Sequence, residues 1–263
     1  MNNPIIKKAI LALCLAVPSM LLASPQVEVV KAIGVRGDVT ITNNETGRVS
    51  RLAEDALFTA GTTVSTGKNS SATVMFSTGT FIAVPSNTTF VVETFEQEAF
   101  SSDKGEFETL KVEPSVSDLR IKLVDGRMTG RTAKLTPDSN LQIDCEVGAV
   151  TITGTIWDIS ATVDTVNNNT VLTISNLEGG VTYNLGSRFA SVQSGDSMTV
   201  SFNEAGQDPG EILIVANGSM SAVDARAILE FLLSDLANST TTTDTIPDPD
   251  VPFLDITVIS IEQ

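Results

Sequence analysis

Through most of its length the chain is a succession of short segments in which apolar and polar residues alternate. In one such segment, Leu119, Ile121 and Leu123 alternate with basic residues. Successive side chains of a β-strand point to opposite faces, so this alternation predicts strands that bury one face. Turn-forming glycines separate the segments, and no helical period lies between them. The sequence therefore predicts an all-β fold, a solenoid-like or sandwich arrangement of many short strands, followed by one C-terminal amphipathic helix.

Four further segments repeat the alternation. Their predicted apolar faces are Leu141, Ile143, Cys145 and Val147; Trp157, Ile159, Ala161 and Val163; Val181, Tyr183 and Leu185; and Met198, Val200 and Phe202. The opposite faces of the first two segments consist of Gln142, Asp144 and Glu146, and of Asp158, Ser160, Thr162 and Asp164. The apolar faces together supply the side chains of a hydrophobic core.

The first 23 residues have the pattern of a secretory signal peptide. Lys7 and Lys8 precede a 15-residue apolar run that ends at Ala23, and we expect cleavage after Ala23. An uncleaved membrane anchor is the alternative, but the run contains Pro18 and is shorter than the roughly 20 residues needed to span a bilayer. We therefore expect a secreted or periplasmic protein of the cell envelope, without a membrane span in its mature part. The mature part keeps one cysteine, Cys145, and so has no internal disulfide.

Composition excludes several classes of function. The chain has 32 acidic and 16 basic residues, which argues against nucleic-acid binding, and no histidine, which is the commonest general base and metal ligand. We therefore predict no catalytic residue, no cofactor and no metal site. Residues 204–263 hold 11 acidic residues and a single basic one, Arg226, which marks the end of the chain as a different kind of segment.

A second concentration of acidic residues lies within the predicted β region. It consists of Glu93, Glu96, Glu98, Asp103, Glu106, Glu108 and Glu113. This cluster is either a docking surface for a basic partner or for divalent cations, or a solvated face that keeps an exported protein soluble.

The end of the chain divides into three parts. Residues 219–237 are amphipathic, and we expect a helix that packs on the β domain or on a partner; its apolar stripe comprises Val223, Ala227, Ile228, Phe231, Leu232 and Leu236. Residues 238–252 are typical of a flexible, acidic linker. Residues 253–263 are strongly β-forming and can pair with a sheet edge of the same chain or of another molecule. The candidate interaction residues in this strand are Phe253, Leu254, Ile256, Val258, Ile259 and Ile261.

An ordered series of motifs resembles the core of FecR-like domains. In the first motif, Gly61 precedes Val-Ser-Thr-Gly, which is followed by Ser-Ala-Thr-Val, by Gly-Thr-Phe-Ile and by a closing Thr. The series occupies residues 52–88, 119–131, 150–159, 177–181 and 194–200. The resemblance covers residues 34–202, and Thr153 stands where the family usually has an arginine.

The resemblance implies an extracytoplasmic, β-rich module, here residues 24–218, that binds proteins and is not an enzyme. The best-known FecR-like proteins are transmembrane anti-sigma regulators with a helical cytoplasmic N-terminal segment. Because a signal sequence begins at residue 1 of this chain, we expect a free-standing exported member that acts in extracytoplasmic sensing or scaffolding. Its expected partner is a protein of the envelope or a second copy of itself.

Two other functions are compatible with the sequence. The first is a self-assembling structural or surface protein, joined through the strand 253–263. The second is a carbohydrate-active enzyme on a β scaffold, in which Asp144 and Glu146, about 7 Å apart on one strand face, act as paired carboxylates. The alternation places Cys145 inside between them, and no histidine is present to activate its thiol.

Overall fold

The computed structural model describes residues 28–100, 110–154, 156–164, 169–203 and 213–219. These residues form 17 strands in one continuous, open sheet, and no helix occurs among them. The prediction of an all-β fold with many strands is therefore confirmed. The predicted signal peptide (1–23), the linker (238–252), the terminal strand (253–263) and all but the first residue of the predicted helix (219–237) lie outside the described residues.

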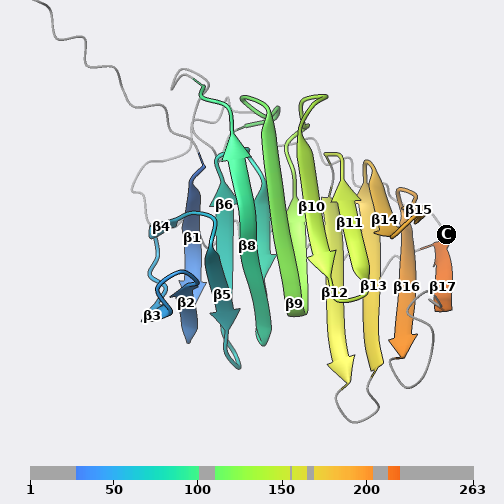
Figure 1. The fold of residues 1–263 in the computed structure, drawn as a ribbon, viewed down its shortest axis with the longest axis horizontal. Coiled ribbons are helices and arrows are strands. Elements are labelled where there is room, and N and C mark those ends of the chain that lie inside the picture. The colour runs from blue at the N-terminus through green and yellow to red at the C-terminus, as the bar shows by residue number, and fades with distance from the viewer. Residues whose placement is uncertain (1–27, 101–109, 155, 165–168, 204–212, 220–263) are drawn as a thin grey trace, which may run out of the picture.

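The strands form two layers, here called sheet A and sheet B. In hydrogen-bonded order, sheet A contains β4 (Leu57–Phe58), β1 (Val30–Arg36), β6 (Ser71–Phe76), β7 (Phe81–Val84), the second part of β9 (Ser117–Arg131), β12 (Ile156–Asp164), β13 (Asn169–Glu178), β16 (Asp196–Asn203) and β17 (Leu213–Ser219). Sheet B contains β3 (Arg48–Arg51), β2 (Val39–Asn43), β5 (Thr62–Thr66), β8 (Thr88–Gln97), the first part of β9, β10 (Asn140–Cys145), β11 (Gly148–Ile152), β14 (Val181–Leu185) and β15 (Arg188–Val192). Figure 1 shows that the strands cross the molecule largely in chain order, from β1–β4 at one end to β15–β17 at the other.

Strand β9 joins the two layers, and a glycine allows it to do so. Asp125 still pairs with Thr89 in sheet B, whereas Gly126 pairs with Ala161 in sheet A. Gly126 has a φ of 99°, and a Cβ at this position would lie 2.6 Å from the carbonyl oxygen of Asn87. Only glycine fits such a backbone and such a close approach. The strand can therefore change layers without ending.

The core lies between the sheets and follows the predicted alternation. Leu119, Ile121 and Leu123 are fully or almost fully buried in it, as predicted. Trp157, the only tryptophan, is completely buried, and its indole N–H donates to Thr132 Oγ1 at 3.1 Å. The indole ring lies directly against Gly130 of β9. A Cβ on Gly130 would lie 2.1 Å from Trp157 Cζ2, so no larger residue fits at this position.

Two expectations about individual strands are wrong. Val163, predicted to face the core, is 38% exposed because it lies near the end of β12, beyond the buried part of that strand. Glu146, predicted to continue the polar face of β10, lies instead in the two-residue turn that joins Cys145 to Gly148.

The outward side of sheet A is buried where the alternation predicts a polar face. Asp158 points away from the core, yet it is only 5% exposed. It accepts hydrogen bonds from Arg127 Nε at 2.7 Å and from Thr129 Oγ1 at 2.5 Å. Burial raises the pKa of this carboxyl, and the charge of Arg127 opposes that effect.

Candidate functional site

Half of strand β8 has a free edge. Strand β5 pairs with β8 only as far as Thr62↔Val92, whereas β8 continues to Gln97 and pairs there with Ser117 of β9. Among the described strands, none flanks residues 93–97 on the β5 side. A free edge presents unpaired backbone N–H and C=O groups, which is the usual template for the addition of another strand.

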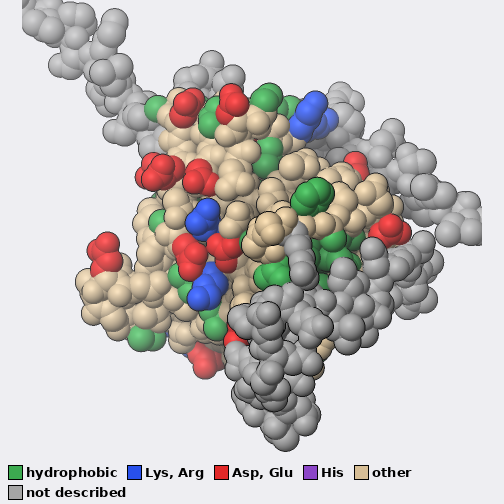
Figure 2. Space-filling model, turned by 45° about the vertical axis from the view of Figure 1, so that its right-hand side comes forward, with side chains coloured by type: hydrophobic (Ala, Val, Ile, Leu, Met, Phe, Trp, Pro, Cys, Tyr) green, Lys and Arg blue, Asp and Glu red, His purple; other side chains and the backbone are tan. Residues whose placement is uncertain are grey.

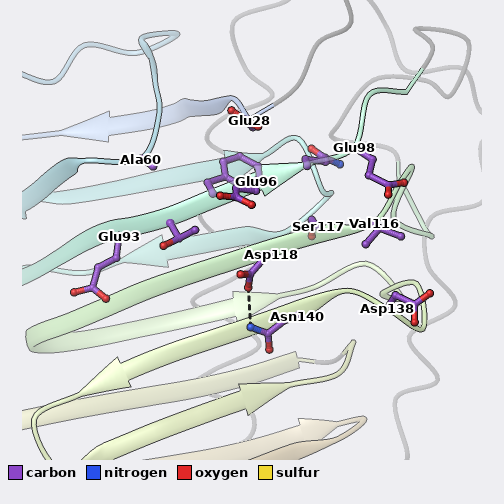
Figure 3. A pocket seen from close by; sticks show the side chains of 13 residues that line it. Glu28, Ala60, Glu93, Glu96, Glu98, Val116, Ser117, Asp118, Asp138 and Asn140 are labelled. Atoms are coloured by element: carbon purple, nitrogen blue, oxygen red, sulfur yellow. Dashed lines mark hydrogen bonds between the residues drawn. The ribbon is translucent and has the colours of Figure 1, made fainter.

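A groove of about 990 Å³ runs along this free edge. Six of its lining residues are acidic: Glu28, Glu93, Glu96, Glu98, Asp118 and Asp138. Figure 3 shows Glu93 and Glu96 spaced along one strand, Asp118 on the neighbouring strand β9, Asn140 on β10 beyond it, and Glu28 on the other side of the groove. Figure 2 shows acidic side chains spread over one face of the molecule, with few basic ones between them.

Two carboxylates of the groove lie side by side on neighbouring strands. Glu96 and Asp118 are direct cross-strand neighbours, an arrangement that is unfavourable for two like charges. Asn140 Nδ2 donates to Asp118 Oδ1 at 2.8 Å, which holds that carboxylate in place (Figure 3). Glu93, Glu96 and Glu98 are exposed. The groove therefore favours a cationic ligand that relieves this repulsion.

The last residue of the edge strand carries a buried hydrogen-bond donor without a partner. Gln97 is 7% exposed, and its Oε1 accepts from Ser77 Oγ at 2.6 Å. Its Nε2 has no hydrogen-bond partner among the described residues. A buried donor without an acceptor costs about 1–3 kcal/mol.

The acidic cluster predicted from the sequence is not a single surface. Glu113 is 4% exposed and has a structural role in its loop. Its carboxylate accepts from Ser117 Oγ, from the Thr136 N–H at 3.0 Å and from Thr136 Oγ1 at 3.3 Å. Asp103, Glu106 and Glu108 lie outside the described residues. Of the predicted set, Glu93, Glu96 and Glu98 therefore line the groove, and Glu113 does not.

The paired carboxylates considered for catalysis are held by neighbours and do not share a strand face. Asp144 accepts from Gln142 Nε2 at 2.6 Å and lies 3.8 Å from Arg120 Nε. Glu146, in the turn, accepts from Thr170 Oγ1 of β13 at 3.1 Å. Both line a shallow depression of about 720 Å³.

The thiol between these carboxylates is not activated. Cys145 is buried, as predicted, and burial, helped by the charge of Asp144, raises the pKa of its thiol to about 12. A thiol with this pKa stays protonated at neutral pH and is a poor nucleophile.

Neither a metal cluster nor a membrane helix is found in the described part of the chain. No group of three or more Asp, Glu or Cys side chains there has an arrangement that could hold a metal ion. Within the same residues, no helix has the length and hydropathy required to cross a bilayer. The candidate interaction residues Phe253 to Ile261 lie outside the described residues, so the structure does not place them.

Sequence reasoning missed part of the groove. Five lining residues were not among the candidates because their position at the groove depends on how distant segments come together: Glu28, Gln97, Asp118, Asp138 and Asn140. The clean alternation around Asp118 signalled that this side chain points outward. Nothing local signalled that it lies opposite Glu96.

Comparison with known proteins finds a family match for part of the chain. The sequence model of the family described as FecR protein matches residues 62–182, and no curated protein matches significantly. A candidate anti-sigma factor from Parabacteroides distasonis ATCC 8503 is 13% identical, with a TM-score of 0.43, over 64% of this chain and 63% of that one. A second candidate anti-sigma factor from the same organism is 15% identical, with a TM-score of 0.44, over 73% of this chain and 80% of that one. The chain thus spans less than two thirds of the first of these structures.

The matched region begins with β5 and ends within β14, so it includes β8 with its free edge and β9. The resemblance seen in the motifs is confirmed for this region: residues 62–182 of the chain match the FecR family.

Proposed function

We propose that this protein is an exported, non-catalytic FecR module that binds a basic, extended segment of another envelope protein. The observation that carries the proposal is the coincidence of a free strand edge with an acidic groove along residues 93–97 of β8. A partner segment would add as a strand to this edge, which pairs its main chain. Its basic side chains would then contact Glu93 and Glu96.

The exposed carboxylates of the groove are suited to selecting a basic partner and contribute less to the affinity of the complex. Exposed charges steer encounter and select partners, while main-chain pairing supplies affinity. Five residues of strand span about 16 Å, which accommodates a segment of similar length. Export is supported by the signal-peptide pattern of residues 1–23, and a non-catalytic role by the inert thiol of Cys145. Within this proposal, the FecR domain supports a role in sensing or in scaffolding.

The proposal is tested by chemical cross-linking in the native host with tagged mature chain (residues 24–263). A groove variant carries Glu93→Gln, Glu96→Gln and Glu98→Gln. A matched control carries Glu45→Gln, Glu54→Gln and Asp125→Asn, which neutralise three exposed carboxylates outside the groove. We expect a protein with a basic segment to be recovered with the parent and the control, and at least tenfold less of it with the groove variant. Equal recovery with all three chains would contradict the proposed site.

A second candidate function is self-assembly through the strand 253–263. It is favoured by exposed apolar side chains on the outermost strands: Val49 of β3 is 62% exposed, Leu57 of β4 is 65% exposed and Phe189 of β15 is 78% exposed. Such edges accept a strand from a second copy. Sedimentation of the mature chain with and without residues 253–263 tests this. Association that persists without the strand, or a monomer at high concentration with it, would exclude this function.

A further inference from the structure

A row of side chains crosses five neighbouring strands on the outward face of sheet B. This row, called here the outer row, lies on β9, β10, β11, β14 and β15, and each residue pairs with the next: Lys122, Asp144, Ala149, Asn184 and Phe189. Figure 1 shows these strands side by side. The row points outward because it alternates with core residues of the same strands, Ile143, Val150 and Tyr183. Its four strand spacings give it a length of about 19 Å.

The middle of the outer row is hollowed. All of its residues except Phe189 line the shallow depression of about 720 Å³. Ala149 lies between the longer side chains of Asp144 and Asn184, and Gly148, which has no side chain, also contributes to the lining. Small residues therefore leave room for a ligand between polar neighbours.

The amide side chains of the depression are held in place and present unused acceptors. Gln142 Nε2 donates to Asp144 Oδ1 at 2.6 Å, and Asn184 Nδ2 donates to Thr151 Oγ1 at 3.0 Å. Both amide nitrogens thus have partners within the sheet, whereas neither amide oxygen accepts a hydrogen bond from another described residue. The two oxygens are available to ligand groups that donate, such as hydroxyls.

The depression has more charge compensation than the acidic groove along β8. Asp144 has Lys122 as its direct neighbour on β9, and its Oδ2 lies 3.8 Å from Arg120 Nε. The lining of the groove, in contrast, contains six carboxylates and neither lysine nor arginine. An uncharged ligand therefore suits the depression better than it suits the groove. Glu93 belongs to both linings, so the two adjoin.

An exposed aromatic ring ends the outer row. Phe189 is 78% exposed, more than any other large hydrophobic side chain in the described part of the chain. It lies directly across from Asn184, which places the two Cβ atoms about 5 Å apart. The face of a phenyl ring is electron-rich and attracts C–H groups. A sugar ring carries C–H groups on its faces and hydroxyls around its edge, so it matches both the phenyl ring and the amide oxygens beside it.

We infer that the outer row is a binding site for a neutral oligosaccharide, distinct from the peptide site proposed above and independent of it. One sugar ring stacks on Phe189, and its hydroxyls donate to Asn184 Oδ1. The next rings lie over the depression, where their hydroxyls donate to Gln142 Oε1 and to the carboxylate of Asp144. Lys122 Nζ donates to a sugar oxygen at the other end of the row.

Titration of isotope-labelled mature chain with neutral hexasaccharides tests the inference. The probes are cellohexaose, maltohexaose, mannohexaose, xylohexaose and chitohexaose. We expect at least one probe to shift the backbone amide signals of residues 142–149 and 182–189, and added salt to leave this binding unchanged, because the ligand carries no charge. No shift with any probe, or shifts confined to other strands, would overturn the site.

Substitutions at the exposed ring test its role. We expect Phe189→Ala to weaken binding of the active probe at least tenfold, and Phe189→Trp to bind as tightly as the parent or more tightly. The matched control is Val49→Ala, which truncates another exposed side chain, 62% exposed, at the opposite end of sheet B and should bind like the parent. Equal binding by Phe189→Ala would overturn the stacking contact.

A second variant tests the depression without altering the ring. Ala149→Tyr fills the hollow between Asp144 and Asn184, and we expect it to weaken binding at least tenfold while the urea midpoint stays close to that of the parent. Parent-like binding by Ala149→Tyr would overturn the site. If no probe binds and Phe189→Ala instead abolishes association between copies in sedimentation, the ring belongs to a self-assembly surface and the inference fails.

Discussion

The contact between Gly130 and Trp157 allows a quantitative test of the core. A Cβ at position 130 would lie 2.1, 2.4 and 2.7 Å from three atoms of the indole ring, which is completely buried and cannot swing away. Overpacking of this kind destabilises a protein by about 1–3 kcal/mol. Displacement of the ring would also break its hydrogen bond to Thr132, worth about 1 kcal/mol. We therefore expect Gly130→Ala to lower the free energy of unfolding by about 2–4 kcal/mol.

The second substitution, Trp157→Phe, removes the ring atoms that a Cβ at position 130 would meet. By itself it should cost about 2–3 kcal/mol, because it leaves a small cavity and an unpaired hydroxyl at Thr132. In the double variant, the added methyl group occupies part of that cavity. The loss should therefore be smaller than the sum of the single losses by at least about 1 kcal/mol. Urea unfolding followed by far-UV circular dichroism measures all four proteins, since Trp157→Phe removes the only tryptophan. Additivity within about 0.5 kcal/mol would refute this account of the contact.

Three further predictions concern single residues. At pH 8 the Cys145 thiol should react with a thiol reagent at least about 100-fold more slowly in the native mature chain than in the unfolded chain. The reason is that burial raises the pKa of this thiol from 9.0 to about 12. Rapid labelling of the native protein would contradict the burial of Cys145. The folded pKa of Asp158 is raised, so its contribution to stability is complete below its ordinary pKa of 3.8 and is lost as pH rises through the folded value. The unfolding free energy of the parent minus that of Asp158→Asn should accordingly fall from pH 3 to pH 7. A difference that rises over this range would contradict the raised pKa of Asp158. Gly126→Ala should lower the unfolding free energy by about 2–4 kcal/mol, and an unchanged urea midpoint would show that β9 does not need this backbone.

The local pattern of the sequence predicts which residues of a strand share a face. Leu119, Ile121 and Leu123 are buried as expected because alternation is a property of each strand by itself. The failures begin where a strand ends: Glu146 lies in a turn and Val163 lies beyond the core, and neither end is marked by a strong breaker.

Layers and edges depend on contacts between distant residues, which alternation does not encode. The change of layer at Gly126 and the pairing of Glu96 with Asp118 are set by register, so the sequence predicted neither. The burial of Asp158 and its hydrogen bonds to Arg127 and Thr129 of β9 also depend on strand pairing, although its own strand alternates as expected. The groove was therefore only half visible in the sequence, as a set of acidic residues without the free edge beside them.

Backbone amide shifts in a peptide titration test the proposed binding site most directly. Isotope-labelled mature chain is titrated at low salt with a decapeptide of alternating lysine and valine, and separately with one of alternating glutamate and valine. We predict that the lysine peptide shifts the amide signals of residues 93–97 and that salt weakens this binding, because charge attraction contributes to it. The glutamate peptide should leave these signals unchanged. Shifts of equal size with both peptides, or shifts confined to other strands, would show that the edge of β8 is not the binding site.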